Sequence, residues 1–287
     1  MPLLYTLVTI AAVAMGAAWA TLPPLGAIAA CMALGAATCG VLAWLAASTR
    51  TQCFVPTQYT GDGSENQIAL TFDDGPDPRW TPRVLELLAA HGARATFFVV
   101  GERAERHPGL VRAIADAGHQ IGTHSFSHGR WFHCQRRSGL AADIRKGVDA
   151  VAAIVGRTPL AFRPPMGLRV PHLQQAWPLV GLPLTCVTWT ARGVDACARQ
   201  ADPILRNLLP ALRPGAILTL HDGAGLGGSD DRTPTLQALA RLLPAIAERG
   251  LRSVRLDELA FARPWRAWLE SPSAPVPAPP PRAGTSP

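Results

Sequence analysis

The ten residues Ile68–Asp77 read IALTFDDGPD, an apolar run that ends in two adjacent carboxylates and a Gly-Pro turn. A short run rich in apolar and β-branched residues, bounded by turn residues, is typical of a β-strand. The stretch therefore predicts a strand over Ile68–Phe72, with Asp73 and Asp74 just past its C-terminal end.

Similar β-type runs recur along the chain, and amphipathic helical stretches separate most of them. The further runs are Ala95–Val100, His119–Gly122, Ala161–Arg163, Leu184–Trp189, Ala216–Leu220 and Arg252–Val254. Helical periodicity is seen where residues recur at i, i+3, i+4 and i+7, as do Val84, Leu87, Leu88 and His91. Strands that alternate with helices indicate an α/β fold with a largely parallel sheet.

The candidate catalytic and metal-binding residues lie at the ends of these predicted strands. Adjacent carboxylates such as Asp73 and Asp74 repel each other unless a cation or a shared proton neutralises them. His124 and His128 follow another strand, and their i, i+4 spacing would place both imidazoles on one face of a helical turn. Two imidazoles and one carboxylate with open positions would make a catalytic metal site. An Asp-rich turn that caps the next helix and a chance histidine pair are the alternatives.

Two more segments stand at strand ends. Arg163–Gly167 reads RPPMG, and its consecutive prolines would fix the backbone and hold the arginine in place, unless the segment is an ordinary loop. Leu218–Asp222 reads LTLHD, an apolar strand that ends in a titratable pair. Histidine is the side chain best suited to deliver a proton near neutral pH, so His221 is a candidate general acid.

The N-terminal part has a different composition, because no Lys, Arg, Asp or Glu precedes Arg50. Two apolar runs, Leu3–Leu22 and Leu25–Ala47, are separated by two prolines, and each is long enough as a helix to cross a hydrocarbon core of about 30 Å. They predict a transmembrane helical hairpin over residues 1–48, in a membrane of the bacterial inner-membrane type. A cleavable signal peptide competes with this interpretation, but the basic n-region is missing. Which face carries the rest of the chain stays open.

The rest of the chain has the charge density of a soluble domain, which excludes a protein embedded in a membrane throughout. The net charge is +7, but no basic cluster with interleaved aromatics is present, so nucleic acid is not expected as a partner. The predicted division is a linker over 49–66, a catalytic domain over 67–260 and a proline-rich disordered tail over 264–287.

In order and spacing, these segments resemble the NodB-homology polysaccharide deacetylase family, also called carbohydrate esterase family four, over about Gln67 to Leu259. The resemblance implies a distorted (β/α) barrel of about seven strands and metal-dependent hydrolysis of the N-acetyl group of an amino sugar. The implied roles are Asp74, His124 and His128 as metal ligands, Asp73 as general base, Arg163 as the residue that orients this base, and His221 as general acid. The implied cofactor is a divalent metal, with Zn²⁺ expected and Co²⁺, Ni²⁺ or Mn²⁺ as alternatives.

The same resemblance implies substrate contacts at Pro165, Met166, Trp189 and Leu218, of which Leu218 would help to shape an acetate pocket. Two positions depart from the family pattern. Met166 stands where many relatives carry an aromatic residue, and Arg192 stands where many carry an acid. Asp195 matches a second family acid, which would either support His221 or pair with Arg163.

The substrate is expected to be an N-acetylated glycan or a lipid-linked sugar, with the lipid bilayer as a further partner. A deformylase or other amide hydrolase that acts on a lipid-linked sugar or small amide is the alternative activity. An inactive glycan-binding relative is a third hypothesis, which the retained metal-ligand, base and acid residues disfavour. The sequence leaves the oligomeric state open.

Overall fold

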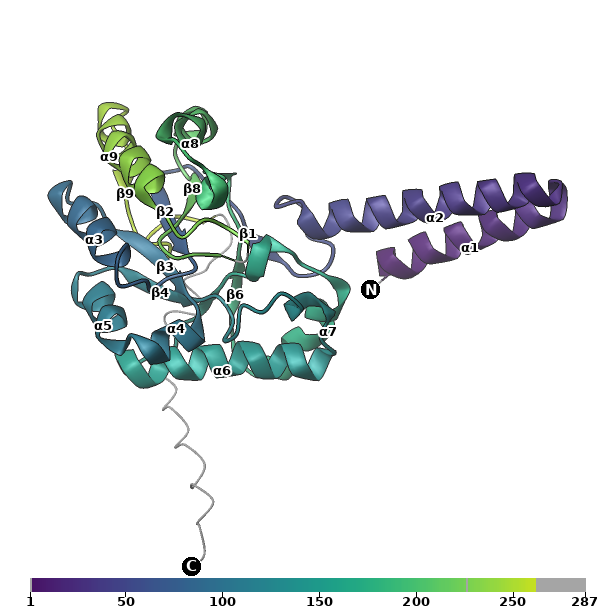
Figure 1. Ribbon diagram of the computed structural model, residues 1–287, viewed down its shortest axis with the longest axis horizontal. Helices are drawn as coiled ribbons and strands as arrows, with labels where there is room; N and C mark the ends of the chain where they lie inside the picture. The colour runs from purple at the N-terminus through teal and green to yellow at the C-terminus, as the bar shows by residue number, and fades with distance from the viewer. Residues whose placement is uncertain (1, 226, 262–287) are drawn as a thin grey trace, which may run out of the picture.

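The strands form one parallel sheet in the computed structural model, which describes residues 2–225 and 227–261 (Figure 1). The strands are β1 (Thr57–Gln58), β2 (Gln67–Asp73), β3 (Ala95–Val99), β4 (Gln120–Thr123), β5 (Ala161–Phe162), β6 (Thr185–Val187), β7 (Ala191–Arg192), β8 (Ile217–His221) and β9 (Arg252–Ser253). Each of the seven predicted runs overlaps one of them, with bounds that differ by up to two residues at either end. The two others, β1 and β7, are two residues long and lie outside the predicted runs. The predicted tail at 264–287 lies outside the described residues.

The sheet curves into an incomplete barrel. Its strand order is β1-β6-β5-β4-β3-β2-β8-β7, and β9 pairs with β2. Hydrogen bonds join the segments near the two ends of this order: Thr188 N–H donates to the Gln58 carbonyl at 2.8 Å, and the Thr190 hydroxyl donates to the Tyr59 carbonyl at 2.8 Å. The predicted α/β distorted barrel is therefore confirmed, as a half-barrel of parallel strands.

Helices cover the outer face of the sheet (Figure 1). They are α3 (Thr81–Ala90), α4 (Gly101–Arg106), α5 (Pro108–Asp116), α6 (Arg137–Val155), α7 (Pro171–Val180), α8 (Ala201–Leu208) and α9 (Thr233–Glu248). The apolar side of α3 buries Val84 and Leu88 in the largest core cluster, between the sheet and its helices. Burial of each such side chain stabilises the fold by about 1.5–3 kcal/mol. The helices thus fix the strand ends that carry the polar residues.

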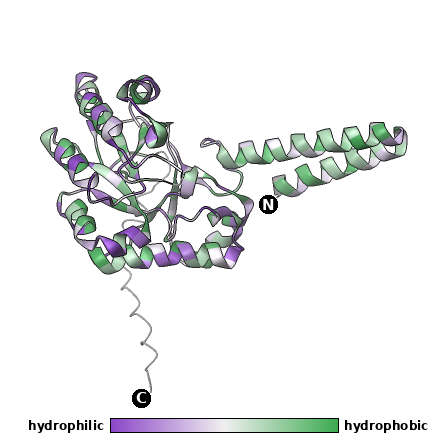
Figure 2. Cartoon of the chain, viewed as in Figure 1, coloured by the Kyte–Doolittle hydropathy of each residue, from purple (hydrophilic) through white to green (hydrophobic). Residues whose placement is uncertain are grey.

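Two apolar helices precede the barrel, α1 (Pro2–Thr21) and α2 (Pro24–Ala47), and they pack side by side as a hairpin that projects from the domain. Figure 2 shows that the hairpin is predominantly hydrophobic along its length. Both helices are long and apolar enough to cross a membrane, with mean hydropathies of 1.6 and 2.0, and almost none of their residues is buried. By the same length and composition, a signal sequence would also qualify.

The C-terminal end of α2 is fastened to the domain by Arg169, which is buried. Its backbone N–H donates to the Ala46 carbonyl at 3.0 Å, and its guanidinium donates to the carbonyls of Ser48 and Thr51. A cation is stabilised at a helix C-terminus because the last carbonyls are unpaired and carry partial negative charge. Phe54 is buried against Leu45 beside this contact. The hairpin therefore meets the domain through a packed contact.

Candidate active site

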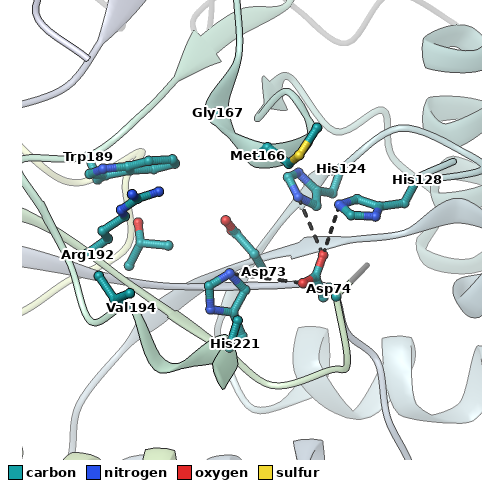
Figure 3. Close-up of a pocket in the computed structure, with 13 residues that line it drawn as sticks. Asp73, Asp74, His124, His128, Met166, Gly167, Trp189, Arg192, Val194 and His221 are labelled. Carbon is teal, nitrogen blue, oxygen red and sulfur yellow. Dashed lines mark ion pairs between the residues drawn. The ribbon is translucent and has the colours of Figure 1, made fainter. Parts of the chain in front are cut away.

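A cavity of about 320 Å³ opens at the C-terminal ends of the strands (Figure 3). Its lining residues are Asp73, Asp74, His124, His128, Met166, Gly167, Trp189, Arg192, Val194, Ala196, Thr219, His221 and Gly225. These residues are far apart in sequence and come together because the strands are parallel and end at the same edge. Two carboxylates and three imidazoles meet in this cavity, which makes it the candidate active site.

Asp73, the last residue of β2, is almost completely buried and is held by Arg163. The Arg163 guanidinium donates to Asp73 Oδ1 at 2.7 Å, to the Thr71 hydroxyl at 2.8 Å and to the Thr188 carbonyl at 2.8 Å. Burial raises the pKa of Asp73, and the charge of Arg163 opposes this shift. Since Arg163 is itself fully buried, its hydrogen bond fixes one oxygen of Asp73 at the pocket wall.

Asp74 follows with a positive φ of 69°, a conformation that Asp tolerates better than most residues, and its carboxylate faces the two histidines. Asp74 Oδ1 lies 3.6 Å from His124 Nε2 and 3.1 Å from His128 Nε2 (Figure 3). The same oxygen is buried and has no hydrogen-bond partner among the described residues.

The donor atoms fit a divalent cation. One ligand atom from each of Asp74, His124 and His128 lies within 4.8 Å of the others. His124 Nδ1 lies 2.7 Å from the Arg163 carbonyl, which can only accept, so Nδ1 carries the proton and Nε2 keeps its lone pair. Burial and the nearby His128 lower the pKa of His124 well below its usual value, so the ring stays neutral. A buried carboxylate oxygen that has no hydrogen-bond partner and faces the Nε2 atoms of two histidines is a ligand set for a metal.

The two histidines do not lie on a helical turn, and this part of the prediction is wrong. His124 continues β4 by donating its N–H to the Val99 carbonyl at 2.8 Å, and the following residues form a loop with positive φ at Ser125 and His128. The His128 N–H donates to the Ser125 side-chain oxygen at 3.0 Å, which closes the loop. The spacing still brings the imidazoles together, with ring centroids 4.8 Å apart, because the loop folds back on itself.

Two neighbouring helices hold this histidine loop, residues 124–128. At the start of α4, the Gly101 N–H donates to the Ser125 carbonyl at 3.0 Å. The Glu102 N–H donates to the Phe126 carbonyl, also at 3.0 Å. From α6, Asp143 Oδ1 accepts from the Phe126 N–H at 2.9 Å. Gly147 of α6 sits so close that a Cβ there would lie 2.7 Å from the Ser125 carbonyl carbon. The positions of both imidazoles therefore depend on a tight helix-to-loop contact.

We expect Gly147→Ala to lower metal affinity by about 10- to 100-fold, the usual effect of disturbing the residues that orient metal ligands. The added methyl group would push the Ser125–Phe126 backbone away from α6 and displace the imidazoles. Metal affinity is measured by competition with a chromophoric chelator. Gly139→Ala is the matched control, since its methyl group would meet only the side chain of Gln135, just before α6, and no backbone atom. An unchanged affinity in Gly147→Ala would contradict this role of the contact.

His221, the last residue of β8, is held by Asp195. His221 Nδ1 donates to Asp195 Oδ1 at 2.7 Å and its backbone N–H donates to Oδ2 at 2.9 Å, while the Thr235 hydroxyl donates to Oδ2 at 2.8 Å. Burial alone would lower the pKa of His221, but the charge and hydrogen bond of Asp195, with smaller effects from Asp74 and Asp73, raise it to about 9. The sequence left two possible partners for Asp195, His221 and Arg163. In the structure Asp195 binds His221.

The upper rim is formed by Met166 and Gly167, which follow the buried Pro165 in a short 3₁₀ turn, Pro165–Gly167. Gly167 has a φ of 69°, and a Cβ there would lie 2.2 Å from the Trp189 ring, so only glycine allows this close approach. Met166 is 52% exposed and has a φ of 55°. Trp189 and Met166 therefore both border the pocket.

Leu218 is not part of the pocket, which corrects its prediction as an acetate contact. Alternate residues of a strand point to opposite faces, so Thr219 and His221 line the pocket while Leu218 is fully buried in the core between sheet and helices. Pro165 does not line the pocket either, but its carbonyl lies 2.9 Å from His133 Nε2.

Other residues support the site and were not predicted. They are Thr71, Asp143, Val194, Thr219, Gly225 and Thr235. Thr71 lies within the predicted strand, two residues before Asp73, and strand alternation is a signal that would have placed it on the same face. Asp143 and Thr235 lie in helices and no sequence pattern marks them.

Comparisons with known proteins agree with this geometry. The family model described as polysaccharide deacetylase matches residues 60–182. The chain is 35% identical over 209 residues to a peptidoglycan-N-acetylglucosamine deacetylase of Bacillus cereus, covering 71% of this chain and 94% of the relative. It is 36% identical over 206 residues to a chitooligosaccharide deacetylase of Sinorhizobium fredii, covering 68% and 91%. It also resembles the crystal structure of the Bc1960 peptidoglycan N-acetylglucosamine deacetylase, with a TM-score of 0.64, 32% identity and coverage of 70% and 91%.

Proposed function

This chain belongs to the polysaccharide deacetylase family, and we propose that it removes the N-acetyl group from an amino sugar of a glycan such as peptidoglycan or a chitooligosaccharide. It is a carbohydrate N-deacetylase, a hydrolase of carbon–nitrogen bonds other than peptide bonds. The observation that carries the proposal is the arrangement of Asp73 and His221 in one pocket with the metal triad of Asp74, His124 and His128.

In this proposal Asp73 is the general base. Its Oδ1 is engaged by Arg163, which leaves the rest of the carboxylate directed at the pocket to accept a proton from the attacking water. Asp74, His124 and His128 hold a divalent metal, for which we propose Zn²⁺, with Co²⁺, Ni²⁺ or Mn²⁺ as alternatives. When bound, such an ion supplies Lewis acidity that makes water a better nucleophile and polarises the amide carbonyl.

His221 is the proposed general acid. Asp195 holds Nδ1, so Nε2 faces the pocket, where it lies 4.0 Å from Asp74 Oδ2. The raised pKa, to about 9, means that the imidazole keeps its second proton at neutral pH and loses it only as the pH rises through that value. A proton on Nε2 can then be transferred to the departing amine nitrogen, which is otherwise a poor leaving group.

Replacing His221 with alanine should slow the hydrolysis of unactivated N-acetyl sugars by about 10²- to 10⁴-fold, the range typical of a lost general acid. Substrates whose amine is a better leaving group should suffer least, because they need less protonation. The rates are measured by acetate release across a series of acetamides with graded amine pKa. An equal loss across the series would count against the acid role. His107→Ala, outside the pocket lining, is the control.

We also propose that the hairpin anchors the enzyme in a membrane. The aromatic residues Tyr5 and Trp44 are exposed near the domain end of the two helices, and Trp19 is exposed near the turn, an arrangement typical of the two membrane interfaces. Met166 at the pocket rim is three residues from Arg169, hence within about 11 Å of the residue that binds the end of α2. The pocket would therefore work close to the bilayer, which suits a glycan attached to a lipid or to the nearby cell wall.

The proposed activity is tested by incubating the metal-loaded full chain in detergent or vesicles with chitooligosaccharides and with peptidoglycan fragments. Release of acetate and of free amine in equal amounts is the expected result. Release of formate alone from N-formyl sugars would instead support the deformylase, and no turnover with any amide would support the inactive glycan-binding relative. Reporter fusions at the C-terminus, compared with and without residues 1–48, test the anchor and its topology.

A further inference from the structure

The pocket contains a cation that the proposed mechanism does not use, the guanidinium of Arg192. Two other charged groups that line the pocket have counter-charges, since Asp73 pairs with Arg163 and His221 pairs with Asp195, and Asp74 belongs to the metal triad. Among the residues that the structure describes, no carboxylate pairs with Arg192, although it lines the same cavity and is exposed. Its charge is therefore available to a molecule that enters the pocket.

The pleat of the sheet directs Arg192 to the pocket side. In the pairing of β7 with β8, Ala191 lies opposite Leu218, and Arg192 lies opposite Thr219. Leu218 is buried in the core between sheet and helices, and Thr219 lines the pocket, so the register puts Arg192 on the pocket face as well. Thr219 is two residues before His221 in β8. Arg192, which lies opposite Thr219, is therefore displaced by about 7 Å from His221 along the strand direction.

Trp189 lies beside the guanidinium but does not neutralise it. The guanidinium carbon of Arg192 lies 5.8 Å from the centre of the Trp189 ring, and Figure 3 shows the two side chains together on the side of Asp73 opposite His124 and His128. The ring is itself fixed by its close contact with Gly167. An aromatic face attracts a cation but provides no counter-charge and no hydrogen-bond acceptor. The donors of Arg192 thus remain free for an oxyanion.

We propose that Arg192 binds a carboxylate or phosphate group of the substrate, so that the enzyme prefers an N-acetylated sugar that carries a negative charge. This inference rests on the proposed deacetylase function and names its substrate class. The planar guanidinium matches either oxyanion with two parallel hydrogen bonds. Because Arg192 and His221 are displaced by only about 7 Å along the strand, the charged group belongs to the sugar that is deacetylated or to its direct neighbour.

The test compares three probes with the metal-loaded full chain: neutral triacetylchitotriose, the same trisaccharide oxidised to a carboxylate at C6, and N-acetylglucosamine 1-phosphate. In Arg192→Ala, kcat/KM for at least one anionic probe should fall at least tenfold more than kcat/KM for the neutral trisaccharide. Arg192→Lys should retain part of the preference, and Arg192→Glu should lose more of it than alanine. Which anionic probe responds identifies carboxylate or phosphate as the recognised group.

Binding gives a second readout that does not need turnover. In a protein that carries Asp73→Asn and therefore does not turn over, calorimetry should show that Arg192→Ala weakens binding of the anionic probe. This loss of affinity should be larger at low than at high ionic strength, because salt screens charge interactions. Arg112→Ala, an exposed arginine of α5 outside the pocket lining, is the matched control. Equal changes for neutral and anionic probes in both assays would overturn the assignment of Arg192. Failure of the wild type to release acetate from any probe would instead contradict the deacetylase function, which keeps the two failures distinct.

Discussion

In the variant His124→Ala we expect the protein to lose its metal and almost all deacetylase activity. His124 Nε2 is one of three protein ligand atoms in the Asp74, His124, His128 set, and Asp74 Oδ1, which faces both imidazoles, has no hydrogen-bond partner among the described residues. Removal of a ligand should weaken binding by more than the 10- to 100-fold that is typical for loss of an outer hydrogen-bond partner. Metal content after gel filtration and acetate release measure the two effects.

The control for this variant is His172→Ala, an exposed histidine at the start of α7 that is outside the pocket. It should keep full metal content. A second measurement separates loss of metal from loss of fold: a chelator should lower the melting temperature of the wild type, because a ligand that binds only the folded state stabilises it. The same chelator should leave His124→Ala unchanged. A metal stoichiometry in His124→Ala equal to that of the wild type would refute the ligand assignment.

The sheet could be predicted because its strands leave strong local signals. Ile68–Phe72 is an apolar run long enough to be recognised alone, and its position next to Asp73 and Asp74 points to a site at the strand end. The rule that parallel strands end at one edge then gathers Asp74, His124, His128 and His221 without any knowledge of distances. The strand β7 escapes this reasoning, since Ala191 and Arg192 lie outside every predicted run and form no apolar stretch of their own.

The support of the site was less predictable because it depends on the tertiary positions of single side chains. From the sequence, the partner of Asp195 could be either His221 or Arg163. Only the course of the chain after β7 decides that Asp195 lies beside His221. Leu218 was misplaced since a family motif gives its position along the strand, whereas strand alternation decides which face it occupies. The loop that carries His124 and His128 shows the same limit, because i, i+4 spacing is shared by a helical turn and a loop closed by Ser125.

Replacing Asp73 with asparagine should reduce kcat by about 10²- to 10⁴-fold, the contribution typical of a general base, while the metal stays bound. Asparagine keeps the shape of the side chain but cannot accept the proton of water at neutral pH. Because Asp73 is not itself one of the three ligands, the metal content should match that of the wild type. This combination of lost turnover and retained metal separates the base from the ligands.

The same substitution leaves the buried Arg163 without its counter-charge, so stability must be measured with activity. Breaking a buried ion pair by removing one partner typically costs about 3–5 kcal/mol, although here the Thr71 hydroxyl and the Thr188 carbonyl still bind the guanidinium. Asp149→Asn, which removes one carboxylate of an exposed pair with Arg145, is the control and should leave both kcat and melting temperature nearly unchanged. Activity is therefore compared well below the melting temperature of each variant. If Asp73→Asn is folded, metal-loaded and fully active there, Asp73 is not the base, and another group must take the proton from water.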